Sequence, residues 1–398
     1  MLKVIKIIPN TFENASRDKR ELSIIQGFGC ELLVFCKKNQ NNEIIKQNDT
    51  VQIFPMTTKP LGSNNKLNIL NRIISFFSWS IAIRQQKSYC ISCHDLIALG
   101  IGWVSTVFLP RDDKPLIVYD SHEFEMGRNS DGTRGVLSNF FIAKIEKFLM
   151  HKSALSIMVN DSIADAVFSK HKLKERPTVV RNIPAFWKID EEVCKETRLK
   201  ICSQLKIPPE TFIVMYHGSV IKGRGIENVL QAISSVKNVV FVILGDGDVQ
   251  YLKSIEKRII QLGVKESVLM HKAVPLEDLW KYVGAADVGI SLTPNTCMNH
   301  YYMLPNKLFE NIQSMTPIIG SDFPEIRKII NKYDIGLLVD PESIEEISRA
   351  IEQMRCDKPM YFRFKENLIK AKAELCWEKE SQVLIDAYRK IFKRQNYI

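Results

Sequence analysis

Short runs rich in β-branched residues alternate with longer amphipathic stretches along the chain, and this alternation restricts the fold more than any other feature. Parallel strands joined by crossover helices produce such a pattern, because each strand is buried on both faces and each helix on one. In the first half the predicted strands are residues 3–8, 31–35, 51–54, 89–92, 116–119, 155–159 and 178–180. Together they would form one doubly wound sheet, so the sequence predicts an α/β fold.

A second series of strands follows a break in the pattern between residues 182 and 192, which contains Pro184 and then becomes charged. Its predicted strands are residues 212–216, 239–244, 267–270, 288–291, 317–320 and 336–339. A chain of 398 residues is long enough for two separate cores. We therefore expect an N-terminal domain over residues 1–187, a C-terminal domain over residues 188–375 and a terminal segment, 376–398, containing an amphipathic helix.

The composition excludes several classes of protein. Hydrophobic residues make up 45% and charged residues 25% of the chain, as in ordinary globular proteins. The net charge of +10 favours anionic partners, but the basic residues are scattered and form no run of five, so nucleic acid is not an expected partner.

Three further features favour a cytoplasmic protein. Nine cysteines at irregular spacing fit reduced thiols better than a disulfide framework. Residues 1–9 lack the pattern of a signal peptide, and the longest apolar stretch, residues 96–109, is shorter than the roughly 18–20 residues of a membrane span.

The segment from Leu67 to Ile83 contains Arg72 and the aromatic residues Phe76, Phe77 and Trp79. Two interpretations are open: a partly buried surface helix, or an amphipathic helix with exposed aromatic side chains that lies on an anionic membrane surface. The second would make the protein peripheral to the inner face of the membrane.

The first candidate binding motif follows the predicted strand 212–216. Gly218, Gly223 and Gly225 alternate with Lys222 and Arg224 before an amphipathic helix begins. Backbone N–H groups, the positive end of the helix dipole and two cations would together hold a diphosphate. The alternative is an ordinary turn in which the glycines only satisfy backbone geometry.

The second candidate is Glu310, which lies in the first turns of a predicted helix after Pro305. A carboxylate in this position can accept hydrogen bonds from two sugar hydroxyls, as the ribose-binding acid of dinucleotide-binding folds does. The alternative is an acid that only stabilises the helix N-terminus.

Residues 217–232, 242–291 and 304–339, including Leu304-Pro305-Asn306-Lys307-Leu308-Phe309-Glu310, resemble the retaining glycosyltransferases of family 4, also called group 1. The resemblance implies a GT-B fold, in which two Rossmann-like domains face each other and a final helix returns to the N-terminal domain. It also implies that the second domain binds a nucleotide-sugar, which is a substrate, and that neither a metal nor another cofactor is needed.

The resemblance assigns roles around the donor diphosphate. Arg224 is similar to the basic residue that contacts the diphosphate, and Gly218 belongs to the loop beside it. Ser219 stands where many members have an arginine, which leaves more of the phosphate charge to Arg224 and Lys307.

The family's E-x7-E motif is only half present. Glu310 corresponds to its second acid, which holds the ribose, but Tyr302 occupies the position of the first acid. Asn299, Asn306 or backbone N–H groups would then have to contact the donor sugar.

In the first half, residues 118–123 resemble the family segment whose histidine faces the donor sugar. His122 is therefore the candidate in this half and completes the predicted catalytic set with Arg224 and Glu310. By the same resemblance, the loop of residues 10–17 approaches the phosphates and the acceptor, with Ser16 and Arg17 on the acceptor side.

Two other patterns are weaker. Cys90, Cys93 and His94 match the spacing of c-type haem attachment, but that chemistry belongs to exported proteins. Asp246 and Asp248 have the spacing of a metal–nucleotide motif, but they sit in a glycine-rich turn that lacks the third glycine of a dinucleotide fingerprint. We expect neither haem, metal nor NAD.

The expected activity is retaining transfer of a sugar from a nucleotide-sugar to a glycan or lipid-linked glycan, in the synthesis of a bacterial surface polysaccharide. Two alternatives are a sugar-nucleotide epimerase of similar fold and a non-catalytic binding subunit that kept the fold, for which the missing acid at Tyr302 argues.

Overall fold

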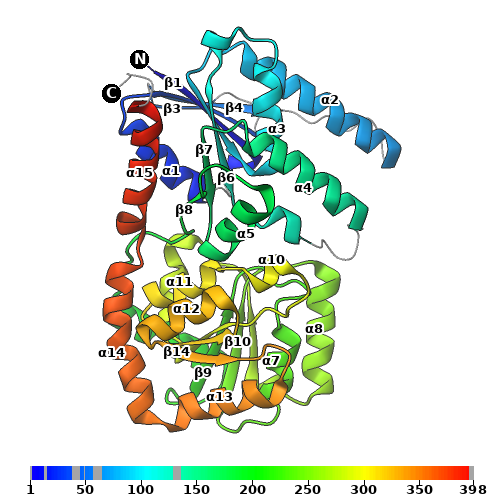
Figure 1. The fold of residues 1–398 in the computed structure, drawn as a ribbon. Coiled ribbons are helices and arrows are strands. Elements are labelled where there is room, and N and C mark those ends of the chain that lie inside the picture. The colour runs from blue at the N-terminus through cyan, green and yellow to red at the C-terminus, as the bar shows by residue number, and fades with distance from the viewer. Residues whose placement is uncertain are drawn as a thin grey trace. The chain divides into compact units, whose positions relative to one another are not determined.

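The computed structural model describes residues 2–12, 16–37, 45–48, 50–56, 65–128 and 136–393 (Figure 1). The chain forms two compact units. The first contains residues 1–181 and 381–398, and the second contains residues 182–380. The divisions lie close to the expected domain ends at residues 187 and 375.

The first unit is built on an eight-stranded sheet in the order β3-β4-β2-β1-β5-β6-β7-β8. All neighbouring strands are parallel except β3, which pairs antiparallel with β4 at the edge. The strands are β1 (Lys3–Thr11), β2 (Glu31–Lys37), β3 (Ile45–Asn48), β4 (Val51–Met56), β5 (Cys90–His94), β6 (Leu116–Ser121), β7 (Leu155–Met158) and β8 (Thr178–Val179).

In the described parts of this unit, α-helices connect the strands, and part of the chain's last helix packs against the same unit. The connecting helices are α1 (Ser16–Gln26), α2 (Asn65–Arg84), α3 (Asp95–Thr106), α4 (Val136–Met150) and α5 (Asp161–His171). The last helix of the chain, α15 (Trp377–Lys393), contributes its residues from Ser381 onward. Tyr388 of α15 donates a hydrogen bond to Ser92 of β5 at 3.2 Å, and the ring of Phe392 meets Phe28 edge-on.

The second unit has a wholly parallel six-stranded sheet in the order β11-β10-β9-β12-β13-β14. Its strands are β9 (Phe212–His217), β10 (Val239–Leu244), β11 (Val268–His271), β12 (Val288–Ser291), β13 (Ile318–Ser321) and β14 (Gly336–Val339). Its helices are α6 (Glu191–Leu205), α7 (Ile226–Ile233), α8 (Val249–Gln261), α9 (Leu279–Gly284), α10 (Met298–Tyr301), α11 (Asn306–Gln313), α12 (Pro324–Tyr333), α13 (Ile344–Cys356) and α14 (Lys358–Glu374).

The strands of the second sheet are apolar on both faces because helices cover both. Along β9, Val214 and Tyr216 point into a core shared with α7, α8 and α13, whereas Ile213 and Met215 point into a core shared with α6 and α9. Successive side chains of a strand point to opposite faces, so each continuous apolar run fills two cores at once.

The loops that follow β9 and β10 are joined by backbone hydrogen bonds, and their backbones approach each other closely. Gly218 N–H donates to the Leu244 carbonyl at 2.9 Å, and Val220 N–H donates to the Asp246 carbonyl at 2.8 Å. A Cβ on Gly245 would lie only 1.9 Å from the Gly218 carbonyl oxygen. The glycine at residue 245 is therefore required for the two backbones to approach.

All the predicted strands of both halves are present, and the predicted α/β fold is confirmed. The prediction missed β3, a short edge strand outside the apolar pattern. Of the aromatic residues that the membrane-surface interpretation would expose, Phe77 is exposed, whereas Trp79 is buried at 5% exposure. Among the described residues, no helix combines the length and the apolar character that crossing a membrane requires.

We predict that Gly245→Ala lowers the free energy of unfolding by roughly 3 kcal/mol, because the added methyl group would force the Gly218 and Gly245 backbones apart. Urea unfolding followed by circular dichroism measures the loss. Gly263→Ala is the matched control: its φ of +67° is unfavourable for alanine, but the space around it is open, so the loss should be about 1 kcal/mol. Equal losses for the two variants would contradict the steric argument.

Candidate functional site

Each unit places a polar cluster where ligands bind in open α/β sheets, at the carboxyl ends of the strands beside the point where the strand order reverses. In the second unit this point lies between β9 and β12, and in the first it lies between β1 and β5. The two clusters are described separately.

In the second unit, His217 and Glu310 form the centre of the cluster. His217 ends β9 and is buried, whereas Glu310 lies on α11 and is partly exposed. The His217 Nε2 lies 2.9 Å from the Glu310 Oε2, while the buried His217 Nδ1 has no hydrogen-bond partner among the described residues. The histidine thus holds one carboxylate oxygen and leaves the other for a ligand.

Lys307 lies beside this pair, one turn before Glu310 on α11. Its Nζ is 3.6 Å from the centre of the Tyr216 ring, and a Cβ on Gly218 would be 3.2 Å from its Cε. Burial lowers the pKa of Lys307 well below its ordinary value, with a further lowering by Arg224 that Glu310 only partly opposes. The negative charge near Lys307 is therefore too small to offset the effect of burial and Arg224 on its protonated form.

Arg224 is half-buried in the turn before α7 and close enough to influence the pKa of Lys307. Within the described part of the chain, neither Arg224 nor Lys307 forms an ion pair with a carboxylate. Two cations at one strand end without such partners are suited to bind an anion.

The loop itself offers fewer donors than its glycines suggest. The Gly218 N–H is already bonded to the Leu244 carbonyl, so it is not available to a phosphate. Ser219 is exposed, and its carbonyl accepts a hydrogen bond of 2.6 Å from Tyr216. The N–H groups of Gly218 and Val220 are thus both taken up by backbone hydrogen bonds.

The residues expected near the donor sugar lie just before α11. Asn299 is on α10, Tyr302 follows it, and both are partly buried with contacts of their own. Asn306 is the first residue of α11 and is exposed. The Tyr302 ring packs against Tyr301 at 5.5 Å.

In the first unit, a buried ion network surrounds Lys6 of β1, whose side chain is 0% exposed. Its Nζ lies 3.0 Å from Asp18, 3.7 Å from Asp120 and in closer contact with Glu21. Burial alone would lower the pKa of Lys6, but the three carboxylates raise it well above its ordinary value. Lys6 is therefore a permanent buried cation.

Arg17 completes this network instead of facing a ligand. Its guanidinium pairs with Glu21 and with Asp120, both at 2.8 Å, and donates to the Val180 carbonyl at 3.0 Å. It is buried, whereas Ser16, the first residue of α1, is partly exposed. The acceptor-side role expected for Arg17 would have to operate through this network. Residues 13–15 of the loop expected to approach the acceptor lie outside the described residues.

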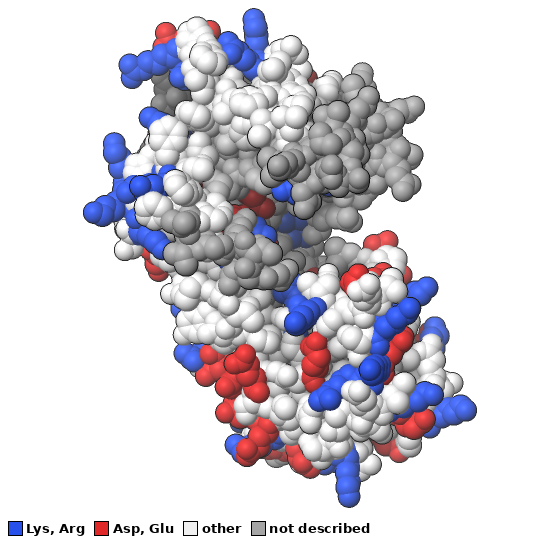
Figure 2. Space-filling view, turned by 90° about the vertical axis from the view of Figure 1, so that its right-hand side faces the viewer, with Lys and Arg blue, Asp and Glu red and all other residues white. Residues whose placement is uncertain are grey.

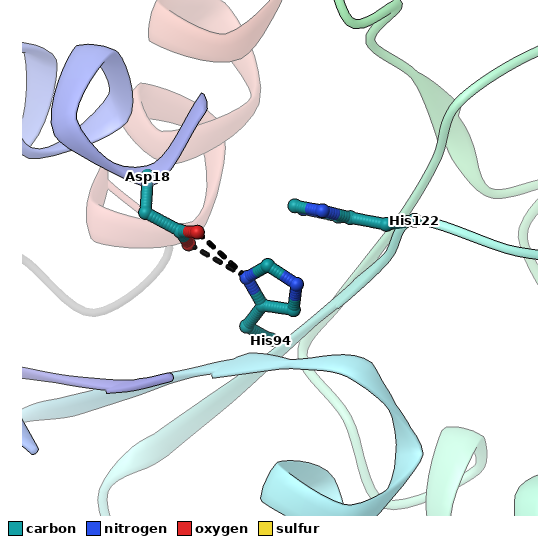
Figure 3. Close-up of side chains that lie close together, drawn as sticks. All are labelled: Asp18, His94 and His122. Carbon is teal, nitrogen blue, oxygen red and sulfur yellow. Dashed lines mark hydrogen bonds and ion pairs between the residues drawn. The ribbon is translucent and has the colours of Figure 1, made fainter. Parts of the chain in front are cut away.

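His94 and His122 lie against each other at the edge of the network, with ring centres 3.7 Å apart (Figure 3). The His94 Nδ1 bonds to Asp18 at 2.8 Å and its Nε2 lies 3.3 Å from Asp95. Burial would lower the pKa of His94, but the hydrogen bonds to these two carboxylates raise it to about 10. His94 is therefore a cation at neutral pH.

His122 is held from two sides. Its ring Nε2 lies 3.1 Å from Asp120, and its backbone N–H donates to the Asp95 carboxylate at 3.0 Å. Asp95 thus connects His94 to His122, and the partly exposed His122 ring has a defined orientation.

The first-unit cluster also has the ligand types of a metal site. The donor atoms of Asp18, His94 and His122 lie within 4.8 Å of one another, as do those of Glu21, Asp120 and His122. However, Lys6 and Arg17 already neutralise the carboxylates of these sets, and a dication would be repelled by both. These residues do not fit a metal ion, and metal independence stays a prediction.

The two weaker sequence patterns have structural roles. Cys90 and Cys93 are both fully buried in β5, and their odd spacing places them on opposite faces of the strand, which does not suit haem attachment. Asp248 caps α8 by accepting from the Gln250 and Tyr251 N–H groups, and Asp246 accepts from the Ala273 N–H. Both aspartates therefore hold backbone groups.

Sequence reasoning missed His217 and most of the first-unit network. His217 directly follows a predicted strand in a predicted binding loop, so its position was a usable signal. Lys6 gave a weaker signal. It lies in an apolar strand that is buried on both faces, and a buried lysine needs an acidic partner. Nothing in the sequence indicates which acids those are.

We predict that His94 contributes pH-dependent stability. Because its folded pKa of about 10 exceeds the ordinary value of 6.5, this contribution is fully present below about pH 6.5 and is lost as the pH rises toward 10. The wild-type protein should therefore be more stable than His94→Gln by on the order of a few kcal/mol at low pH, with the difference shrinking toward pH 10.

Urea unfolding at both ends of this pH range measures the difference. His151→Gln, which changes an exposed histidine of the same unit, is the control and should show no such trend. A stability difference for His94→Gln that stays constant with pH would contradict the assignment.

Comparisons with known proteins bear on both units. Residues 198–371 match the family described as "Glycosyl transferases group 1". The lipopolysaccharide core biosynthesis glycosyltransferase LpsE of Rhizobium meliloti is 24% identical over 186 residues, which cover 47% of this chain and 51% of that protein. The chain thus spans about half the length of this curated relative.

Solved structures resemble the chain over nearly its whole length. Sucrose-phosphate synthase from Thermosynechococcus elongatus has a TM-score of 0.79 at 16% identity, with 99% of this chain and 100% of that chain covered. HepE of Anabaena in complex with UDP and glucose has a TM-score of 0.72 at 14% identity, covering 98% and 100%. The lipopolysaccharide outer core galactosyltransferase WaaB has a TM-score of 0.66 at 12% identity, covering 98% and 99%.

These likenesses confirm the predicted GT-B fold. The family match covers most of the second unit, including His217, Arg224, Lys307 and Glu310. Residues 198–371 are thus similar to the group 1 glycosyltransferases, and the whole chain shares their GT-B fold.

Proposed function

We propose that this protein is a retaining glycosyltransferase that moves a sugar from a nucleotide-sugar donor to a glycan or lipid-linked glycan. The arrangement of Glu310, Lys307 and Arg224 at the end of β9 carries the proposal, because it provides for both parts of a nucleoside diphosphate. Transfer requires no other cofactor and no metal.

The nucleoside side depends on Glu310. With one oxygen held by His217, the carboxylate has a defined orientation and can accept hydrogen bonds from the two hydroxyls of a ribose. His217 would act as a positioning residue because it contacts Glu310 and not the substrate.

The diphosphate side depends on Arg224 and Lys307. As the bond to the sugar breaks, negative charge develops on the departing diphosphate, and preorganised cations stabilise it. Removal of water from a partly buried lysine makes this interaction stronger than it would be in solution.

Retention of the anomeric configuration follows from the proposed family chemistry. The leaving phosphate takes the proton of the acceptor hydroxyl on the same face of the sugar, so no protein nucleophile is needed. Tyr302, Asn299 and Asn306 are the proposed contacts of the donor sugar in the second unit, and His122 is the proposed contribution of the first.

The names of similar proteins support the substrate class. HepE binds UDP, glucose and UDP-glucose, and both LpsE and WaaB are described as lipopolysaccharide glycosyltransferases. We therefore place the reaction in the synthesis of a bacterial surface polysaccharide, on the cytoplasmic side of the membrane.

A thermal-shift screen against UDP, GDP, ADP and CMP sugars identifies the donor, because a ligand well above its dissociation constant raises the unfolding temperature. Incubation with that donor then tests the reaction. Release of the free nucleotide only when an acceptor is present supports transfer, whereas release without acceptor points to an epimerase. Binding with neither reaction points to a non-catalytic subunit, and no binding at all would contradict the proposal.

We predict that Glu310→Ala and Arg224→Ala affect different parts of the ligand. Glu310→Ala should weaken binding of the nucleoside and of its diphosphate equally, by about tenfold to a hundredfold, since hydrogen bonds to a charged group are lost. Arg224→Ala should weaken the diphosphate by a similar factor and leave the nucleoside nearly unchanged. Isothermal titration calorimetry measures both.

Glu345→Ala and Arg349→Ala are matched controls, because this exposed ion pair lies on α13 of the same unit. Neither should change affinity by more than about twofold. Equal losses of nucleoside and diphosphate affinity in Arg224→Ala would contradict the assigned role.

We predict that binding of the diphosphate is linked to protonation of Lys307. Its pKa is well below the ordinary value in the free protein, and a bound diphosphate would raise it. At a pH between these two values, binding should therefore take up a proton. Calorimetry in buffers of different ionisation enthalpy measures the uptake, which should disappear in Lys307→Met. Binding without proton exchange at every pH would contradict the prediction.

A further inference from the structure

Helix α2 presents an apolar stripe to solvent. Leu70, Ile73, Ile74, Phe77 and Ile81 follow helical spacing and are 48–59% exposed. The opposite side of the same helix is buried and carries polar residues. Trp79 and Ile83 are buried on that side too, so α2 carries apolar residues on both of its faces.

The buried side of α2 shows why the stripe points outward. Asn71 is buried, and Ser80 donates to the Phe76 carbonyl at 2.9 Å and is 3.2 Å from the Ile101 carbonyl of α3. Trp79 is also buried. The helix is thus attached to α3 through its own polar and aromatic contacts, and its apolar stripe has no role in the core.

Helix α4 repeats this arrangement. Phe140, Phe141, Ile145 and Phe148 are 47–61% exposed, whereas Glu146 on the other side is buried. Glu146 accepts hydrogen bonds from Tyr119 at 2.9 Å and lies 3.1 Å from the His171 ring nitrogen. A carboxylate therefore faces the core while three phenylalanines face outward.

The two stripes belong to neighbouring helices. Helix α3 packs against both α2 and α4 (Figure 1), and its Ile97 is exposed as well. We call the exposed apolar side chains of α2, α3 and α4 the apolar face. Single exposed apolar residues are common on proteins, but a group on three adjacent helices marks an interaction surface.

Among the described side chains of α2, α3 and α4, the fully exposed charged residues are basic. Arg72 and Arg84 of α2 and Lys144 of α4 are exposed, and the Lys144 Nζ lies 4.4 Å from the centre of the Phe140 ring. The acidic residues among the described side chains of the three helices are Asp95, which pairs with His94, and the buried Glu146. In Figure 2 white atoms lie among blue groups over the described part of the first unit, and both red and blue groups appear over the second unit.

We propose that the apolar face binds the surface of an anionic lipid bilayer. Aromatic and aliphatic side chains would enter the boundary between head groups and acyl chains, with α2 and α4 lying along the surface. Arg72, Arg84 and Lys144 would contact anionic head groups. A second copy of the chain fits less well, because self-association through this face would bring cations of like sign together.

This surface does not depend on the proposed sugar transfer, because lipid binding is measured without donor or acceptor. Sedimentation with vesicles of phosphatidylcholine, alone or with about one third phosphatidylglycerol, provides the assay. The full-length protein should bind the anionic vesicles, bind the neutral ones much more weakly, and be released by salt.

Variants of the apolar face separate its two contributions. Ile74→Ser/Phe77→Ser and Phe141→Ser/Ile145→Ser should each weaken binding by at least about tenfold. Each pair removes two large apolar side chains whose transfer from water into the bilayer would favour binding. Arg72→Glu/Lys144→Glu should weaken binding to the anionic vesicles and have little effect on the residual binding to neutral ones. Since these side chains are exposed, circular dichroism and the unfolding temperature should not change.

Ile260→Ser/Phe362→Ser is the matched control, because both residues are equally large and exposed but lie on the second unit. This pair should bind like the wild type. The proposal is overturned if the wild type does not bind anionic vesicles, if the apolar-face variants bind normally, or if the control pair loses as much. A dimer in solution that the apolar-face variants abolish would assign the face to a second copy and also overturn it.

Discussion

The first unit depends on the neutralisation of Lys6. A charged side chain that is wholly buried inside a parallel strand costs several kcal/mol unless acidic groups surround it. Asp18 and Glu21 come from α1 and Asp120 comes from β6, so satisfying one cation fixes a helix and two strands relative to one another. The helix α1 is thus held by charge as well as by apolar packing.

This network also determines the surroundings of His122. Asp18, after pairing with Lys6, has a second oxygen that bonds His94, and His94 in turn lies against the His122 ring. Asp120 bonds Arg17 with one oxygen and His122 with the other. The partly exposed histidine is therefore the outer end of a chain of contacts that begins in the middle of the sheet.

The second unit uses charge in the opposite way. In the first unit each buried cation has carboxylate partners within hydrogen-bonding distance, and such closed networks serve structure. At the end of β9, Lys307 and Arg224 repel each other, and Glu310 is bonded to His217 instead of pairing with either. A fold tolerates such unfavourable electrostatics where a ligand later supplies the missing charge, which is why shifted pKa values concentrate at functional sites. The contrast between paired and unpaired cations thus distinguishes the proposed donor-binding cluster from the closed ion network around Lys6 and Arg17.

The sequence was sufficient for the fold because each strand carries its own signal. Continuous apolar runs such as Val239–Leu244 predict buried parallel strands without reference to any other part of the chain. The edge strand Ile45–Asn48 was missed because it has a lysine, a glutamine and an asparagine in four residues. Arg224, Lys307 and Glu310 could be proposed as site residues because the resemblance links segments far apart in the sequence. Lys6, Asp18 and Asp120 were not, because their relation exists only after the sheet and α1 have assembled.

Helix α2 shows the limit of periodicity most clearly. The spacing of Leu70, Ile73, Ile74, Phe77 and Ile81 correctly predicts a helix with one apolar stripe, but spacing does not determine the direction in which that stripe points. On the other side, Trp79 is buried and Ser80 donates to the Ile101 carbonyl of α3, and these contacts hold that side of α2 toward the core. Glu146 has the same effect in α4, since its bonds to Tyr119 and His171 turn the phenylalanines outward. In both helices a few specific polar contacts face the core while several apolar side chains remain exposed to water. The free-energy cost of this exposure is removed if the stripe is buried against another surface, such as the proposed bilayer.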